Sequence, residues 1–386
     1  MSRMPLRDSV AEVDLDAIEA NVAFLRARAG VPLIAVVKAD GYGHGAEAVA
    51  PAVLAAGAEM LAVATVEEAL LLRAVDIRAP ILVFLGAAPR GEARAAADAG
   101  LHVAVWRRDQ LDALDDAARG GEPIAVHLKV DTGLTRLGVG PDEAEAYARD
   151  IARRRRLTLA GVYTHLATAD EPDVSFARTQ VETFAKLLDA LPERPRWQHV
   201  LASAGILALA PYGAFTAARP GVALYGLPPA PHLAPGELLP SLRLVSRLAR
   251  VRRVPAGTGV SYGLRYVADR ERVIATVPFG YGDGLPRRAS PGGGMLVRGR
   301  IAPIVGRVCM DLVMLDVSEV PGAREGDEVV MIGGQEAARR TADDFAREID
   351  TINYEVVTNL HPRVPRVYRR GGKVVGVKTA AGYART

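Results

Sequence analysis

The stretch Pro32-Leu33-Ile34-Ala35-Val36-Val37-Lys38-Ala39-Asp40-Gly41-Tyr42-Gly43-His44-Gly45 joins an apolar run to a lysine and a loop of small residues. A continuous apolar, β-branched run is typical of a strand buried on both faces. Lys38 ends this strand, where barrels and open α/β sheets place their chemistry. An ammonium that loses hydration has a lowered pKa, so Lys38 is a candidate nucleophile or base. Taken alone, the pattern fits a salt-bridged or solvent-reaching lysine better.

Eight strand-like segments alternate with helical segments rich in Ala, Leu, Glu and Arg. This alternation predicts parallel strands joined by helical crossovers, and eight such units match an N-terminal (β/α)8 TIM-type barrel. A doubly wound open sheet is the alternative. The barrel is favoured because polar groups follow many strands instead of gathering at one switch point. We predict strands at 33–38, 60–64, 81–85, 102–106, 124–130, 157–164, 198–202 and 222–225.

The pattern changes near Pro240, after which short strands are separated by Gly and Pro. This arrangement predicts a second, mainly β domain. We therefore divide the chain into a barrel of residues 1–239 and a C-terminal β domain of residues 240–386. Thr341 can cap a helix whose first turn is acidic. The predicted strands are 244–254, 271–277, 295–308, 312–317 and 327–332, and the predicted helices are 341–349 and 352–360.

Composition excludes several classes of protein. The 386 residues carry a formal net charge of +3 with acidic and basic residues nearly balanced, which argues against a nucleic-acid partner. Cys309 is the single cysteine, so neither an intrachain disulfide nor a thiolate metal cluster can form, and a reducing compartment is indicated. The sequence lacks a signal-peptide core and a membrane-length apolar stretch, so we expect a cytoplasmic protein without a membrane partner.

Several loops after predicted barrel strands contain groups that could bind a ligand. Arg136, in Asp131-Thr132-Gly133-Leu134-Thr135-Arg136, presents a fork that suits a carboxylate, and it could equally form a structural ion pair. His165 could stack on a flat cofactor, although a buried and satisfied histidine is more common. Ser203 follows the predicted strand 198–202, and Gly221 precedes the predicted strand 222–225. Barrels often bind phosphate near their last two strands, although Ser203 could simply cap a helix and Gly221 could simply form a turn.

The second domain contributes tyrosines set among glycines, in Val260-Ser261-Tyr262-Gly263 and in Gly280-Tyr281-Gly282-Asp283. Such a ring can simply cover a turn. A phenol beside cations, however, can have its pKa lowered enough to act as a base. The segments Cys309-Met310-Asp311 and Asn353-Tyr354-Glu355 are equally weak as isolated signals.

Together these segments resemble the alanine racemase family, pyridoxal-phosphate enzymes with a barrel and a β domain. The likeness runs from Val36-Val37-Lys38-Ala39-Asp40-Gly41-Tyr42-Gly43-His44-Gly45 to Arg363-Val364-Pro365-Arg366-Val367-Tyr368 and so covers nearly the whole chain. The first stretch is a specific signature, and the ordered set makes chance similarity implausible. The resemblance implies interconversion of L- and D-alanine, which supplies D-alanine for peptidoglycan.

The resemblance also implies roles for individual residues. Lys38 would bind pyridoxal 5'-phosphate through an imine and act as one base, and Tyr262 would be the base on the opposite face. Arg219 would contact the pyridine nitrogen and His165 would lie against the ring. The phosphate would be bound by Tyr42, Ser203, Gly221 and Tyr354. The substrate carboxylate would be received by Arg136 and the Met310 N–H. One further residue, Lys129, would be a candidate for carbamylation.

A homodimer with shared active sites is implied as well, in which Tyr262 and Met310 serve the partner's Lys38. Two positions depart from the family pattern: Ala202 stands where asparagine is common, and Leu312 where glutamine is common. They leave the amino-acid range open, from alanine to serine or broader. Two further alternatives are a related barrel decarboxylase, which would place an acid instead of Arg219 at the pyridine nitrogen, and a non-catalytic pyridoxal-phosphate-binding protein.

Overall fold

The computed structural model describes residues 5–87, 91–211 and 214–385. The chain forms two compact units, one of residues 17–41 and 49–240, the other of residues 1–16, 42–48 and 241–386. We call them the barrel unit and the β unit. Within the described residues, each helix is too short or too polar to span a lipid bilayer.

The barrel unit is built on eight parallel strands in the order β2 to β9. Leu33, beside β2, bridges Ala218 of β9 in parallel, and the Val36 N–H donates to the carbonyl of Pro220 at 2.9 Å, so the sheet closes on itself. The predicted barrel is thereby confirmed. The strands are β2 (Ile34–Val36), β3 (Met60–Val63), β4 (Ile81–Val83), β5 (His102–Val105), β6 (Ile124–Lys129), β7 (Leu157–Tyr163), β8 (Trp197–Ala202) and β9 (Ala217–Arg219).

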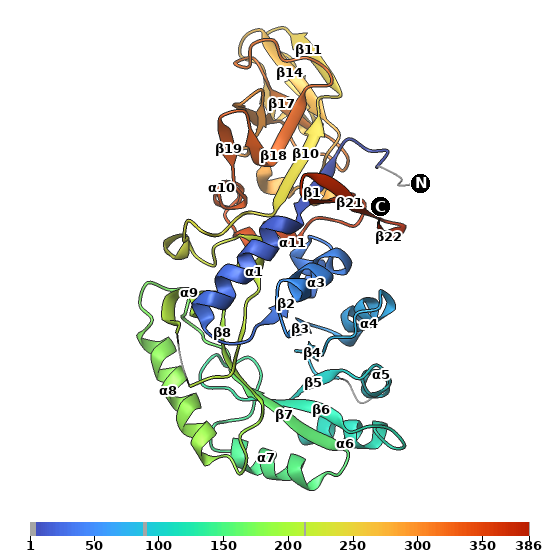
Figure 1. The fold of residues 1–386 in the computed structure, drawn as a ribbon. Coiled ribbons are helices and arrows are strands. Elements are labelled where there is room, and N and C mark those ends of the chain that lie inside the picture. Colours follow the sequence, from blue (N-terminus) through green and yellow to red (C-terminus); the bar gives the residue numbers. More distant parts are fainter. Residues whose placement is uncertain (1–4, 88–90, 212–213, 386) are drawn as a thin grey trace. The chain divides into compact units, whose positions relative to one another are not determined.

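Helices between the strands cover the outside of the sheet, as Figure 1 shows for α4 to α8. Helix α4 begins at a Thr65 cap, whose side chain accepts the Glu68 N–H while the Glu68 side chain accepts from the cap backbone. Helix α6 turns Leu111 and Leu114 inward. The helices are α1 (Leu15–Ala29), α3 (Ala46–Ala55), α4 (Val66–Ala74), α5 (Glu92–Asp98), α6 (Arg108–Ala117), α7 (Ala144–Arg153), α8 (Ser175–Ala190) and α9 (Ser203–Leu209).

The prediction of the last barrel strand is wrong. Residues Val222–Tyr225, predicted as a strand, form the 3-10 helix η1, and the strand is Ala217–Arg219. All four residues of η1 are buried, and a short buried apolar run does not distinguish strand from helix. Pro220 has no N–H to donate to a ladder, so the chain leaves the sheet there. Arg219 consequently ends the eighth strand instead of preceding it.

The β unit has a long mixed sheet in which β1 (Val10–Asp14) lies between β10 and β20. Two predicted strands are in fact pairs: 244–254 is β10 and β11, and 295–308 contains the hairpin of β15 and β16, which turns at Arg298 and Gly299 with φ of 49° and 71°. The sheet strands are β10 (Leu242–Arg247), β11 (Arg250–Val254), β14 (Arg272–Val277), β15 (Gly294–Val297), β16 (Arg300–Val305), β17 (Val313–Asp316), β18 (Glu328–Gln335), β19 (Ala338–Arg340), β20 (Arg366–Arg370), β21 (Lys373–Thr379) and β22 (Gly382–Arg385).

Smaller elements complete the β unit. Strands β12 (Gly259–Val260) and β13 (Tyr266–Val267) form a separate two-stranded sheet. Helices α10 (Ala342–Glu348) and α11 (Asn353–Thr358) follow, and Thr341 caps α10 by accepting the Asp344 N–H, as predicted.

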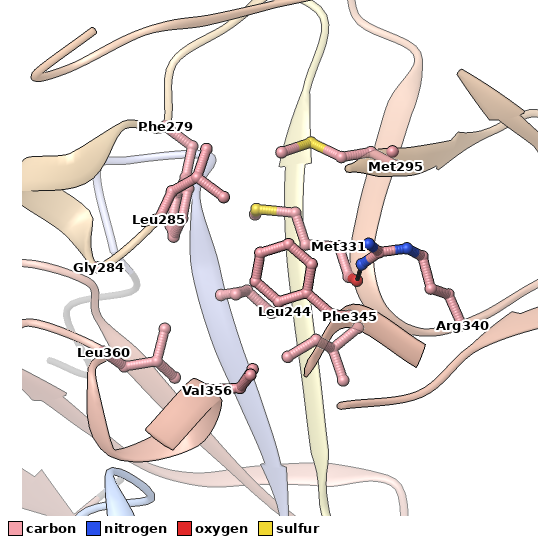
Figure 2. A pocket seen from close by; sticks show the side chains of 12 residues that line it. Leu244, Phe279, Gly284, Leu285, Met295, Met331, Arg340, Phe345, Val356 and Leu360 are labelled. Atoms are coloured by element: carbon pink, nitrogen blue, oxygen red, sulfur yellow. Dashed lines mark hydrogen bonds between the residues drawn. The ribbon is translucent and has the colours of Figure 1, made fainter. Parts of the chain in front are cut away.

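The core of the β unit contains a small apolar cavity of about 10 Å³ (Figure 2). Leu244, Phe279, Met295 and Phe345 are among the side chains around it. Arg340 lies at its edge, donates to the Met331 carbonyl at 2.6 Å and forms an ion pair with Glu348. Burial lowers the pKa of Arg340, and the carboxylate of Glu348 opposes that shift. The two terminal nitrogens of the guanidinium are therefore paired, so Arg340 is a structural charge within an apolar core.

Candidate active site

Lys38 follows the first barrel strand and opens a short turn, α2 (Lys38–Tyr42), of unusual hand. Ala39, Asp40 and Gly41 all have left-handed dihedrals, with φ between 51° and 61° and ψ between 44° and 50°. Left-handed helical geometry costs about 1–2 kcal/mol for each residue that is not glycine. Burial, followed by the charge of Arg136, lowers the pKa of Lys38, and Glu68 opposes that change. The fold thus maintains a strained turn beside a lysine whose pKa is lowered by burial.

Glu68, in the first turn of α4, supports this turn. One carboxylate oxygen accepts the Ala39 N–H at 2.6 Å, and the other accepts the N–H groups of Ala64 at 2.7 Å and Thr65 at 3.4 Å. A single carboxylate therefore links the residue after Lys38 to the end of the neighbouring strand. Sequence analysis missed this role, although the Thr65-to-Glu68 spacing of a capping box is a visible signal.

Arg219 is fully buried at the end of β9, and its guanidinium faces acceptors from three directions. One terminal nitrogen donates to the His199 carbonyl at 2.5 Å and lies 2.9 Å from Nδ1 of the same histidine. The other donates to the carbonyls of Thr164 at 2.8 Å and Val200 at 3.0 Å, and lies 3.4 Å from His165 Nδ1. Burial lowers its pKa to about 10, so Arg219 stays protonated at neutral pH.

Four further cationic or basic groups accompany Arg219 at this end of the barrel: Lys38, Lys129, Arg136 and His165. The pKa of Lys129 falls well below its usual value through burial and the charges of Arg219 and Arg136. The pKa of His165 falls well below its usual value for the same reasons, with Lys38 and Lys129 adding to the effect. The guanidinium charges of Arg219 and Arg136 at this site suit a ligand that carries more than one negative charge.

Tyr163 lies beneath two of these cations. The Nζ atom of Lys129 is 4.7 Å and the guanidinium carbon of Arg219 is 5.2 Å from the centre of its ring. Burial raises the pKa of Tyr163, so the phenol stays neutral and its π face partly offsets the charges.

Ser203 and Gly221 meet where the last two barrel strands end. Ser203 Oγ accepts the Gly221 N–H at 2.9 Å and the Ala223 N–H at 3.2 Å. With its acceptor positions occupied, the hydroxyl proton is left to donate to a ligand. This donor adjoins bare backbone, which suits an anion such as a phosphate.

Tyr42 and Tyr354 approach each other in the β unit, with ring centroids 6.3 Å apart. Burial raises the pKa of Tyr42, so this phenol is a hydrogen-bond donor and not an anion at neutral pH. Gly43 is required beside them, because a side chain there would lie 2.0 Å from the Val357 carbonyl oxygen of α11. The bare backbone lets the loop carrying Tyr42 pack against the helix carrying Tyr354.

Tyr262 and Met310 lie on the surface of the β unit and are 71% and 54% exposed. Tyr262 begins the turn η3 (Tyr262–Leu264), directly after Ser261, whose φ is 64°. Leu264 and Leu312 are exposed large apolar residues of the same two loops. These groups therefore do not complete a site within the β unit itself.

Sequence analysis also missed three histidines that lead away from Arg219 through the barrel: His102, His127 and His199. A partial signal exists, because His127 and Lys129 are two residues apart in one strand and so face the same side. The partners of these histidines are on other strands and leave no mark in the local sequence.

Comparison with known proteins decides the family. The family model for the N-terminal domain of alanine racemase matches residues 13–229, and that for its C-terminal domain matches residues 241–368. An alanine racemase of Symbiobacterium thermophilum is 45% identical over 369 residues, which cover 94% of this chain and 97% of that protein. The chain belongs to the alanine racemase family.

Solved structures of alanine racemases agree with this assignment. The enzyme of Bacillus anthracis with bound L-Ala-P superimposes with a TM-score of 0.90 at 38% identity and covers 98% of this chain and 99% of its own. The enzyme of Streptomyces lavendulae gives a TM-score of 0.90 at 42% identity and covers 96% and 98%. The alanine racemase architecture predicted from the motifs, a barrel followed by a mainly β domain, is confirmed.

Proposed function

We propose that this chain catalyses the pyridoxal-phosphate-dependent interconversion of L-alanine and D-alanine and so supplies D-alanine for peptidoglycan. The supporting observation is Lys38: a lysine with a lowered pKa, at the carboxyl end of a barrel strand, among groups that favour anions. Residues 1–239 would carry the cofactor lysine and residues 240–386 the second base. The single cysteine suits a reducing compartment, and we place the activity in the cytoplasm.

The residues present fit pyridoxal 5'-phosphate. Lys38 would bind its aldehyde, Arg219 would donate to its pyridine nitrogen, and His165 would lie against its ring. Its phosphate would be received by the Ser203 hydroxyl and the Gly221 backbone, with the phenols of Tyr42 and Tyr354 as further donors. When bound, the cofactor withdraws electrons from the substrate Cα and so lets its proton leave.

Racemisation requires proton transfer on both faces of Cα. Lys38, whose pKa is lowered by burial, would accept or return the proton on one face. The Tyr262 hydroxyl would do so on the other, because a single base would have to cross the plane of the substrate. Positioned proton transfer of this kind typically contributes about 10²–10⁴-fold to the rate.

Arg219 would select racemisation over other outcomes. With its pKa about 10, it donates a hydrogen bond without giving up its proton at neutral pH. The pyridine nitrogen that Arg219 would contact therefore gains no proton. As a result, less electron density moves into the ring and more stays near the substrate Cα. An acidic residue at the pyridine nitrogen, as in the decarboxylase alternative, would instead keep that nitrogen protonated and draw electron density into the ring.

Arg136 and the Met310 N–H would receive the substrate carboxylate. We further propose that Lys129 is carbamylated. Its neutral amine nitrogen would attack the carbon of CO2 and form an N–C bond as one C=O π pair moves onto oxygen. The nitrogen would then release one proton, which turns a neutral group into an anion. The lowered pKa of Lys129 supplies the neutral amine, and the anion would pair with Arg136 and Arg219.

The exposed Tyr262 and Met310 support a homodimer in which each β unit serves the partner's Lys38. Mixing two inactive variants, K38A and Y262F, tests this arrangement. A mixed dimer would contain one site with both defects and one site with none, so about a quarter of the wild-type activity should return. If both bases of a site come from one chain, mixing restores nothing.

Exchange of the Cα hydrogen for deuterium, measured with a panel of L- and D-amino acids, tests the function. We expect exchange and inversion with alanine in both directions, because exchange reports proton removal itself. Inversion of serine as well would identify a broader racemase. Cofactor binding without exchange in any amino acid would support a non-catalytic protein, and release of CO2 from lysine, ornithine or diaminopimelate would support a decarboxylase.

A further inference from the structure

We propose that His102, His127 and His199 form a one-way hydrogen-bond relay through the barrel that fixes the guanidinium of Arg219. They are positioning residues, because they act through Arg219. Their effect on the reaction rests on the proposed function, whereas the relay itself is a property of the folded chain.

The three imidazoles and Arg219 form a continuous series of contacts between barrel strands β5, β6, β8 and β9. His102 Nδ1 is 3.0 Å from His127 Nε2, and His127 Nδ1 is 2.9 Å from His199 Nε2. His199 Nδ1 is in turn 2.9 Å from a terminal nitrogen of Arg219. His127 and His199 thus each use Nε2 toward the preceding ring, which for His127 is His102, and Nδ1 toward the next group, which for His199 is Arg219.

The charge of Arg219 fixes the tautomer of each ring. A guanidinium only donates, so His199 Nδ1 must accept and His199 carries its proton on Nε2. That proton faces His127 Nδ1, which therefore accepts, and His127 in turn donates from Nε2 to His102 Nδ1. All three rings are neutral Nε2–H tautomers, and reversing any one of them places two donors or two acceptors face to face.

The surroundings of the relay favour this neutral state. His127 and His199 are fully buried, and His102 is partly buried near the charges of Arg73 and Arg196. Burial and neighbouring positive charges lower the pKa of all three histidines. A proton added to His102 would also remove the acceptor of His127.

The backbone makes room for the relay. Gly161 of β7 pairs with His127, and a side chain there would lie 2.3 Å from His127 Nδ1. The His199 ring is stacked on Tyr163 at a centroid distance of 4.8 Å and an interplanar angle of 8°. Glycine on one strand and an aromatic platform beside the next ring hold both imidazoles in line with Arg219.

Nitrogen-15 NMR of histidine-labelled protein tests the relay in the apoenzyme and the holoenzyme, with resonances assigned from single-site variants. At pH 7 we expect His102, His127 and His199 each to be protonated on Nε2 alone. A protonated Nδ1 or a cationic ring at any of the three positions would overturn the proposal, whatever the activity of the protein.

Variants at the accessible end test the effect on Arg219. His102→Leu removes the acceptor for His127, whereas His102→Asn leaves an oxygen near the position of Nδ1. We expect H102L to lower kcat about tenfold in both directions, and H102N to recover most of that loss. Equal rates in H102L and wild type would overturn the proposal.

Two glycine variants provide an independent comparison. Gly161→Ala should displace the His127 ring, lower kcat as H102L does and shift the His199 nitrogen signals. Gly236→Ala is the matched control, because a side chain there meets nothing within 4 Å. Unchanged His199 signals in G161A would contradict the relay. A wild-type protein without alanine racemase activity would refute the proposed function, and the NMR result would still decide the relay.

Discussion

Replacing Glu68 with glutamine should weaken the turn that carries Lys38. The Glu68 carboxylate accepts from Ala39 with one oxygen and from Ala64 and Thr65 with the other. Glutamine has a single oxygen, so its NH2 group must face a backbone donor at one of the two ends. The Ala39 N–H is exposed and the N–H groups of Ala64 and Thr65 are part-buried, so water can replace part of the lost interaction. We therefore expect E68Q to lose about 0.5–1.5 kcal/mol of free energy of unfolding.

The same change should alter the titration of Lys38. Glu68 opposes the lowering of the Lys38 pKa, so its removal should lower this pKa further. Urea unfolding measures the stability, and the pH dependence of Lys38 acylation in the apoenzyme, followed by mass spectrometry, measures the titration. Glu67→Gln is the control, because Glu67 lies in the same helical turn and is exposed. If E68Q and E67Q have equal stability and equal Lys38 titration, the assigned role of Glu68 is wrong.

Three other changes give distinct outcomes. Tyr262→Phe should reduce racemisation about 10²–10⁴-fold while one enantiomer still exchanges its Cα hydrogen, and loss of exchange from both enantiomers would argue against two bases. The apoenzyme should lose stability as pH falls below 6.5, because His102, His127, His165 and His199 have lowered pKa values and the unfolded state binds the protons. From pH 6.5 to 5.5 each histidine should lower the free energy of unfolding, measured with urea, by about 1 kcal/mol, so an H102N variant should lose less than the wild type. Equal losses in the two proteins would show that His102 does not contribute to this pH dependence. Arg219→Glu should raise transamination relative to racemisation, and an unchanged product ratio would refute the selective role of Arg219.

The sequence was informative where chemistry follows the end of a strand. Lys38, His165 and Ser203 each lie within two residues of the end of a barrel strand, and parallel strands bring such ends to one side of a barrel. The hydrophobic pattern and the strand–helix alternation were therefore enough to predict the barrel and most of its polar end. The family resemblance supplied roles that no single loop could indicate.

The sequence was less informative where register between distant strands decides the contact. His127 and His199 are 72 positions apart, and their hydrogen bond depends on how β6, β7 and β8 align. The eighth strand was misplaced because burial made Val222–Tyr225 resemble a strand. The left-handed turn at Ala39 was also not predicted, because alanine rarely adopts this conformation.

Peptide mapping after borohydride reduction tests the central claim most directly. Borohydride converts a reversible link between a lysine and an aldehyde into a stable amine. Digestion and mass spectrometry of the reduced holoenzyme should place one pyridoxyl group on the peptide that contains Lys38. A label on Lys129 or another lysine, or a protein without any label, would contradict the account.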